Sequence, residues 1–285
     1  MQINEKELKQ FITAALVEDL GDGDHTSLSI LEEGSRGEAR LLVKEKGIIA
    51  GVELAGRIFR EVDATLQVNV LIKDGARISP GDVVLTVSGS ARSILTAERL
   101  VLNCMQRMSG IATLTSEVTA VLEGTGTRVL DTRKTTPCIR FLEKWAVRIG
   151  GGVNHRFGLF DMILIKDNHV DYAGGIRPAI LSARKYLKEQ HRSLEIEVEV
   201  RNMNELNEAL ETGGVDRILL DNFTPSALKE AVEHIRGRVV TEASGGIHAG
   251  NLREYAGTGV DFISMGALTH SVKSLDLSLK AVVTD

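Results

Sequence analysis

Positively charged residues follow short apolar segments in the middle of this chain. DTRKTTP (131–137) places Arg133 beside Lys134 directly after the apolar run RVL, and GGGVNHRFG (150–158) places His155 beside Arg156. Lys166 closes another apolar run, in FDMILIKDNH. A guanidinium group offers a planar fork of donors and an ammonium group a compact charge, so both suit carboxylates and phosphates. The pattern predicts a binding site for a small anion.

Carboxylates and glycines follow the later apolar runs of the sequence. Glu199 lies near the end of LEIEVEV and Asp221 in RILLDN, whereas Ser244, Gly245 and Gly246 follow VVTEA and Gly266 lies in SMGA. Carboxylates beside a phosphate site commonly hold magnesium or ribose hydroxyls, and glycine lets a phosphate approach backbone N–H groups. Any one of these charges alone is about as often a solvated loop residue. The interpretation therefore depends on the joint pattern.

The elements that must position these residues are short strands alternating with helices. After Gly126 the apolar runs recur about every twenty to thirty residues, with helical stretches between them, which is typical of a parallel sheet with right-handed crossovers. Six clear runs and a possible seventh near GGGVNHR favour an incomplete, seven-stranded β/α barrel. In such a barrel, residues beyond the carboxyl ends of the strands converge on one opening.

The N-terminal part reads as a separate α/β layer. Short strands between residues 38 and 90 enclose the helical stretch VELAGRIFREV (52–62), and an apolar helix then covers about residues 95–124, where it would connect domains and form a subunit interface. The tail LDLSLKAVV would return to this layer as a strand or a helix. We therefore expect an N-terminal open α/β sandwich at 1–112, completed by 271–285, and a catalytic barrel at 113–270.

Composition excludes several classes of protein. The 285 residues carry a net charge of −5 with pI near 5.9, and no long basic block exists, which argues against nucleic acid and anionic membranes as partners. The sequence shows neither a signal peptide nor an uncharged span, and it has only two cysteines, Cys104 and Cys138, so we expect a cytoplasmic protein.

Two motifs in the sequence resemble known binding loops but do not fit them. GTGTRVL precedes a strand, whereas a dinucleotide-binding glycine turn follows one. DGDHTSLSILEE has Ser27 where a calcium loop needs glycine, so helix capping is the better interpretation.

The same motifs resemble those of the quinolinate phosphoribosyltransferases, the decarboxylating nicotinate-nucleotide pyrophosphorylases of NAD biosynthesis. The resemblance covers nearly the whole chain and rests on EDLGDGDHTS, LTAERLVLNCMQRMSGIAT, DTRKTTP, FLEKWAVRIGGGVNHRFGLFDMILIKDNH, VEVEV, LLDNF, EASGGI and SMGALTHS. One departure is that Cys138 stands after TTP, where the family usually has glycine. This difference is expected to affect the following turn and no charged ligand.

The resemblance implies a function for each of these positions. It assigns the quinolinate carboxylates to Arg99, Arg133, His155, Arg156 and Lys166, with Lys134 nearby. It assigns magnesium and the ribose hydroxyls of phosphoribosyl pyrophosphate to Glu199 and Asp221, and phosphate to Ser244, Gly245, Gly246 and Gly266. The expected catalytic residues are Lys134, Lys166, Glu199 and Asp221. The resemblance further implies a homo-oligomer, a dimer or hexamer, in which Arg99 reaches the partner's site.

Three alternatives stay open at this stage. A related transferase could use nicotinate or another acid without decarboxylation. A lyase could form a Schiff base on Lys166, although its carboxylates and glycine loops would then go unexplained. A silent protein could bind quinolinate without turnover.

Overall fold

The protein was analysed as a computed structural model that describes residues 4–282. The chain forms two compact units. The first comprises the described residues up to Ser116, Thr135–Gly151 and the described residues from Thr269 on; the second comprises Glu117–Lys134 and Gly152–Leu268. The chain thus passes between the units four times, and the segment Thr135–Gly151, which follows the DTRK motif, belongs to the first unit.

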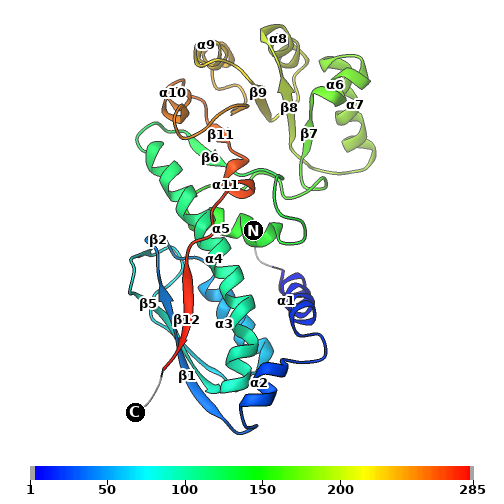
Figure 1. The fold of residues 1–285 in the computed structure, drawn as a ribbon. Coiled ribbons are helices and arrows are strands. Elements are labelled where there is room, and N and C mark those ends of the chain that lie inside the picture. The colour runs from blue at the N-terminus through cyan, green and yellow to red at the C-terminus, as the bar shows by residue number, and fades with distance from the viewer. Residues whose placement is uncertain (1–3, 283–285) are drawn as a thin grey trace. The chain divides into compact units, whose positions relative to one another are not determined.

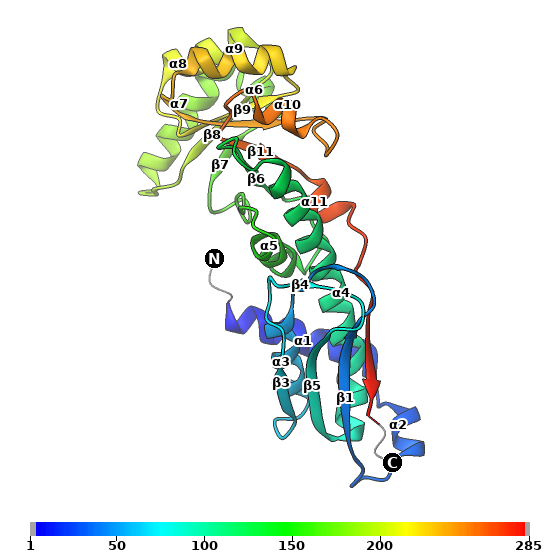
Figure 2. The same cartoon turned by 90° about the vertical axis from the view of Figure 1, so that its left-hand side faces the viewer.

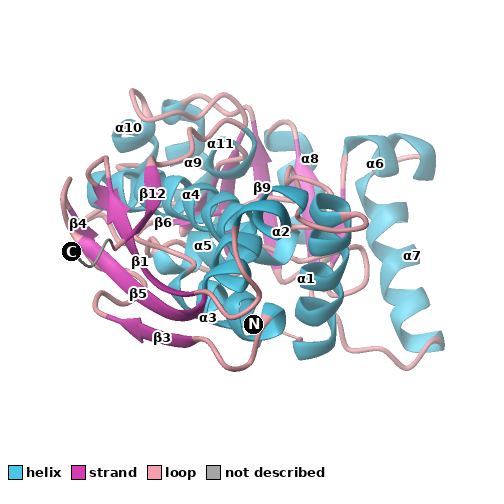
Figure 3. Ribbon diagram, turned by 60° about the horizontal axis from the view of Figure 1, so that its bottom comes forward, coloured by secondary structure: helices cyan, strands magenta, loops and turns pink. Residues whose placement is uncertain are grey.

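The first unit contains a four-stranded antiparallel sheet with the strand order β12-β1-β5-β3 (Figure 3). The C-terminal tail returns as strand β12 beside β1, which confirms one of the two expected forms. A separate pair, β2 and β4, completes the strands of this unit. The strands are β1 (Arg36–Val43), β2 (Gly47–Ile48), β3 (Gln67–Val70), β4 (Arg77–Ile78), β5 (Val83–Ser90) and β12 (Leu277–Ala281).

Two helices of the first unit begin where an aspartate accepts their first backbone N–H groups. The Asp24 side chain accepts the backbone N–H of Ser27, so DGDH serves as a helix cap, as expected from its sequence. The two carboxylate oxygens of Asp74 accept the N–H groups of Val52 and Glu53 at the start of α3. The helices are α1 (Glu5–Leu20), α2 (His25–Ile30), α3 (Val52–Val62), α4 (Ala91–Val121), which continues into the second unit, and α5 (Arg140–Ile149).

The second unit is built on a parallel sheet with the strand order β6-β11-β10-β9-β8-β7. Because β11 pairs with β6, the first and last strands of the unit are neighbours, as in a barrel. The predicted seventh strand near GGGVNHR is reduced to one parallel bridge between Val153 and Leu130. The strands are β6 (Arg128–Leu130), β7 (Ile163–Ile165), β8 (Ile196–Val200), β9 (Arg217–Asp221), β10 (Val240–Ser244) and β11 (Phe262–Ser264).

Helices follow these strands and lie on their outer side (Figures 1 and 2). Asn202 caps α8 directly after β8, and Thr224 with Pro225 starts α9 directly after β9. Each cap fixes the short turn that carries the polar residue at the end of the preceding strand. The helices are α6 (Asp167–Ala173), α7 (Ile176–Glu189), α8 (Met203–Thr212), α9 (Pro225–Ile235), α10 (Leu252–Ala256) and α11 (Ala267–His270, assigned to both units).

Among the described helices, none has the length and apolar character required to cross a membrane.

The backbone conformation at Cys138, in the turn after TTP, explains why the family that the sequence resembles usually has glycine at this position. Cys138 is exposed and has φ of 66°, in the left-handed region, where a side chain costs about 1 kcal/mol and glycine costs little. The chain has therefore kept a backbone conformation that suits glycine. We expect Cys138→Gly to raise the free energy of unfolding by up to about 1 kcal/mol, measured by thermal or urea denaturation. Cys138→Ala is the control, because it removes the thiol and leaves the strain; equal stabilisation by both variants would contradict this explanation.

Candidate active site

The carboxyl ends of the parallel strands bring the predicted polar residues to one edge of the second unit. Lys166 directly follows β7, Glu199 is the fourth of five residues in β8, and Asp221 and Ser244 end β9 and β10. Gly266 follows β11 by two residues. Along the strand order, Lys166 after β7 is followed by the carboxylates on β8 and β9 and then by the glycines after β10 and β11, while Arg133 and Lys134 follow β6 at the opposite end.

Asp131 joins the two cationic segments of the sequence. Its carboxylate accepts the backbone N–H of His155 at 2.8 Å and the side-chain amide of Asn154 at 2.6 Å. Asp131 is fully buried, follows the end of β6 and belongs to the DTRK motif. One carboxylate thus holds the NHR segment against the DTRK segment, and the sequence analysis did not single it out.

Arg133 and Arg156 are the two guanidinium groups that this junction brings together. Arg156 is only 9% exposed, and burial, followed by the charge of Arg133, lowers its pKa. Arg156 donates to the backbone oxygen of Met162 at 3.3 Å, whereas the buried Nε of Arg133 has no hydrogen-bond partner among the described residues. Two like charges are therefore held close together in partial burial, which is favourable for an anion with two negative groups.

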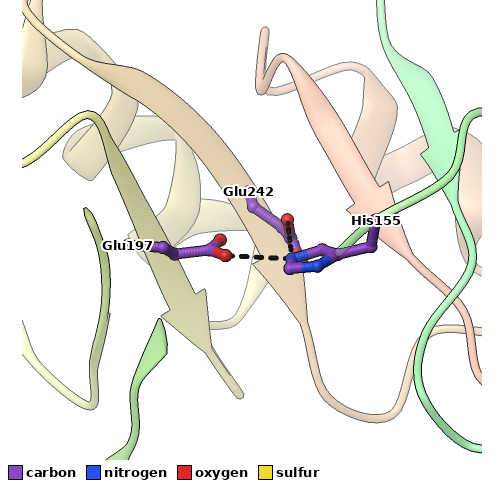
Figure 4. Close-up of side chains that lie close together, drawn as sticks. All are labelled: His155, Glu197 and Glu242. Atoms are coloured by element: carbon purple, nitrogen blue, oxygen red, sulfur yellow. Dashed lines mark ion pairs between the residues drawn. The ribbon is translucent and has the colours of Figure 1, made fainter. Parts of the chain in front are cut away.

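The side chain of His155 lies deeper in the sheet interior than the strand ends do (Figure 4). Its Nε2 is 2.9 Å from Glu197 Oε2 and 3.3 Å from Glu242 Oε2, and its Nδ1 accepts the backbone N–H of Arg156 at 2.7 Å. Both ring nitrogens are thus in contact with the protein. The contact between His155 and the substrate, which the family resemblance implies, stays a prediction.

The two glutamates around His155 are buried, and their pKa values shift in opposite directions. Burial of the ring would lower the pKa of His155, but the two carboxylates outweigh this effect and raise it to about 9. Burial raises the pKa of Glu197, whereas His155, Ser264 and Arg217 outweigh burial at Glu242 and lower its pKa. Glu242, which contacts both His155 and Arg217, therefore ionises more readily than Glu197.

These three side chains also have the spacing of metal ligands. One ligand atom from each of His155, Glu197 and Glu242 lies within 4.8 Å of the others. However, the Oε2 atom of Glu242 that faces His155 also accepts Arg217 Nη1 at 3.1 Å. Glu242 Oε2 is thus already contacted by two protein groups, the His155 ring and the Arg217 guanidinium. We therefore interpret the cluster as a buried ion network.

Lys166, Glu199 and Asp221 form a second charged group at the strand ends. Lys166 Nζ is 3.4 Å from Glu199 Oε2. Burial raises the pKa values of Glu199 and Asp221; Asp221 raises that of Glu199 further, while Lys166 opposes the rise at both acids and Lys134 at Asp221. Paired carboxylate oxygens on neighbouring strands, with their charge only partly compensated, are the donor type that Mg²⁺ prefers. Lys166 and Lys134, whose charges affect these carboxylates, suit the phosphate groups of a ligand that binds the same metal ion.

The Ser244–Gly246 turn is shaped by its neighbour Asn222. A Cβ on Gly245 would lie 2.2 Å from Asn222 Oδ1 and 2.9 Å from the Asn222 backbone nitrogen. Gly245 and Gly246 have φ of 94° and 63°, and Asn222 has φ of 57°. Asn222 also donates to Asp221 Oδ2 at 2.5 Å, so the same residue orients a carboxylate and limits Gly245 to glycine. Gly245 is half-buried and Gly246 exposed, and glycine turns of this kind can bind phosphate through backbone N–H groups.

Four residues of this site were not predicted from the sequence: Asp131, Glu197, Asn222 and Glu242. Signals for two of them were present. Glu197 alternates with Glu199 in EIEVEV, so the two side chains point to the same face of β8. Asp131 is part of the DTRK motif itself. Arg99 lies exposed on α4 in the first unit, where a contact with another chain is sterically possible.

Comparisons with known proteins give one consistent result. The family models for the N-terminal and C-terminal domains of quinolinate phosphoribosyl transferase match residues 24–109 and 111–280. The chain is 46% identical over 289 residues to a mitochondrial quinolinate phosphoribosyltransferase (decarboxylating) of Nicotiana glauca, covering 96% of this chain and 82% of the relative. It is 42% identical to the probable nicotinate-nucleotide pyrophosphorylase (carboxylating) of Bacillus subtilis, covering 99% and 96% of the two chains.

Solved structures agree with the sequence comparisons. The crystal structure of NadC from Streptococcus pyogenes has a TM-score of 0.94 and 39% identity, and it covers all of both chains. The nicotinate-nucleotide pyrophosphorylase from Francisella tularensis has a TM-score of 0.92 and 38% identity, covering 99% of this chain and 98% of its own. The predicted combination of an N-terminal α/β sandwich and an incomplete barrel is therefore confirmed.

Proposed function

Because the chain belongs to the quinolinate phosphoribosyl transferase family, we propose that it transfers phosphoribosyl from phosphoribosyl pyrophosphate to quinolinate with decarboxylation. The products are nicotinate mononucleotide, pyrophosphate and carbon dioxide, a step of NAD biosynthesis. The observation that carries this proposal is that the half-buried Arg133 lies close enough to the buried Arg156 for its charge to lower the pKa of Arg156. Quinolinate has two adjacent carboxylates, and two neighbouring guanidinium groups match them in charge and offer each a planar fork of donors.

The carboxylates at the strand ends suit the second substrate. Glu199 and Asp221 would hold the ribose hydroxyls and Mg²⁺, which neutralises pyrophosphate charge when bound. Lys166 lowers the pKa of Glu199, and both Lys166 and Lys134 lower that of Asp221, so the two ammonium groups lie near these acids. They would neutralise the remaining phosphate charge. Ser244, Gly245, Gly246 and Gly266 would bind phosphate through backbone N–H groups.

The reaction needs positioning and fixed charge, without a covalent enzyme intermediate. The bond between ribose C1 and the pyrophosphate oxygen breaks, the electron pair leaves with pyrophosphate, and the pyridine nitrogen attacks C1. The bond from carbon 2 of the ring to its carboxylate then breaks, carbon dioxide leaves, and a proton takes up the electron pair at carbon 2. The quaternised nitrogen beside carbon 2 stabilises this pair. The protein orients the two reactants and supplies preorganised charge.

The assembly and location of the protein are also part of the proposal. A dimer or hexamer would let Arg99, exposed on α4, contribute to the quinolinate site of a partner subunit. A cytoplasmic location stays a prediction; it is supported by cysteines that are both unpaired, while the relative of Nicotiana glauca is described as mitochondrial.

The function is tested by product analysis with purified protein. Quinolinate, phosphoribosyl pyrophosphate and Mg²⁺ are expected to yield nicotinate mononucleotide and carbon dioxide in equal amounts. Nicotinate is the parallel substrate, and its exclusive turnover would place the protein with transferases that do not decarboxylate. Omission of Mg²⁺ is expected to abolish turnover; unchanged rates in a chelator would contradict the metal assignment.

A further inference from the structure

Glu197 and Glu242 are buried acids to which the proposed reaction gives no direct task. Their side chains are 0% and 1% exposed, and they lie on β8 and β10, one inward-facing layer deeper than Glu199 and Ser244. Burying two carboxylates without a role in folding or binding would be costly. Their closest shared neighbour is the ring of His155 (Figure 4).

A continuous set of contacts connects these acids to Arg156. Nε2 of His155 faces the two carboxylates, and Nδ1 accepts the backbone N–H of Arg156 at 2.7 Å. Asp131 holds the backbone N–H of His155 from the other side. His155, the residue before Arg156, is thus held by contacts of both its ring and its backbone. These contacts fix the backbone position from which the Arg156 side chain extends.

We propose that Glu197 and Glu242 are positioning residues, which hold the His155 ring and thereby fix Arg156 for binding of the pyridine dicarboxylate. This inference rests on the proposed function. Glu197 and Glu242 contact the His155 ring and would influence substrate binding only through it. Glu197 makes the shorter contact with His155 Nε2, 2.9 Å against 3.3 Å. Glu242 has the larger electrostatic part, because its Oε2 atom contacts both His155 and Arg217 and its pKa is lowered, whereas that of Glu197 is raised.

The charge of the ring is set by all groups that face it. Glu197 and Glu242 face Nε2 from β8 and β10, Arg217 on β9 pairs with Glu242, and Asp131 after β6 accepts the backbone N–H of His155. The Arg156 N–H faces Nδ1, so the neutral ring keeps its proton on Nε2, toward the carboxylates. The pKa of His155 is raised to about 9. Protonation of the ring below this pH places a second proton on Nδ1, so the contact in which Nδ1 accepts the Arg156 N–H belongs to the neutral ring.

The test compares KM values for both substrates between pH 7 and 10. In Glu242→Gln the carboxylate charge is lost with little change in shape, and we expect the KM for quinolinate to rise about tenfold while the KM for phosphoribosyl pyrophosphate changes little. The pH at which the quinolinate KM changes should move to lower values, because the pKa of His155 falls when the ring loses a stabilising negative charge. Glu242→Asp keeps the charge and should recover part of the affinity. Glu197→Gln is the second variant, with a smaller effect in the same direction.

Asp261→Asn is the matched control for a general loss of stability. Asp261 accepts both the backbone N–H and the hydroxyl of Thr241, the residue before Glu242, at the other end of the sheet. Its loss should lower Tm without changing the ratio of the two KM values. Equal changes in both KM values, or an unmoved pH profile in both glutamine variants, would overturn the positioning role. An inactive wild-type enzyme would overturn the proposed function and this inference with it.

Discussion

Arg156→Ala is expected to lower kcat/KM for quinolinate by about 100-fold or more and to leave the KM for phosphoribosyl pyrophosphate nearly unchanged. A guanidinium group that makes two charge-assisted hydrogen bonds to a carboxylate contributes about 3 kcal/mol or more, which corresponds to at least two decades in rate. Arg156 is 9% exposed, so solvent screens such an interaction only weakly. The change would appear in steady-state kinetics with each substrate varied in turn.

The stability of the same variant separates a binding role from a structural one. Burial and the charge of Arg133 both lower the pKa of Arg156, so the guanidinium group is in an unfavourable electrostatic environment without an anion. Its removal relieves this repulsion, and we expect Tm not to fall. Arg156→Lys keeps the charge but loses the planar fork, and it should recover only part of the activity. A large drop in Tm, or equal losses for both substrates, would contradict the assignment of Arg156 to quinolinate.

The sequence predicted most of this fold because its strands are apolar runs that end in polar residues. RVL, MILI, IEVEV, RILL and the two later runs all form parallel strands, and the residues after them lie at one edge. The seventh strand was only partly predictable. Val153 makes a single bridge to Leu130, and polar residues follow it at once, so the pattern there is too short to distinguish a strand from a loop.

The interior of the site was harder to predict than its edge. Strand periodicity places Glu197 and Glu199 on one face, but it does not show that one of them lies a layer deeper and meets a histidine. The direction of the His155 ring depends on Glu242, which is 87 positions away in the sequence, and no local pattern encodes that contact. Backbone strain was equally hidden: Cys138 and Asn222 have positive φ, and only the structure reveals it.

Gly245→Ala is expected to lower kcat/KM for phosphoribosyl pyrophosphate by about 100-fold, because a shift of about 1 Å in a binding loop can have this effect. The new Cβ would lie 2.2 Å from Asn222 Oδ1 and 2.9 Å from the Asn222 backbone nitrogen. The side chain could rotate away, but the backbone nitrogen cannot move without Asp221, which precedes it. The turn that binds phosphate and the carboxylate at the end of β9 would therefore be displaced together.

Two further variants distinguish this clash from the general cost of a positive φ. Gly259 has φ of 83°, but a Cβ there would meet only Val232 at 3.8 Å, and it lies before β11, away from the strand ends. Gly259→Ala should lose a similar amount of conformational stability, about 1 kcal/mol, and keep its activity. Asn222→Gly, added to Gly245→Ala, removes the two closest contacts and should restore part of the lost Tm. If Gly245→Ala and Gly259→Ala had the same kinetics, the close approach of Asn222 would have no part in holding the phosphate turn.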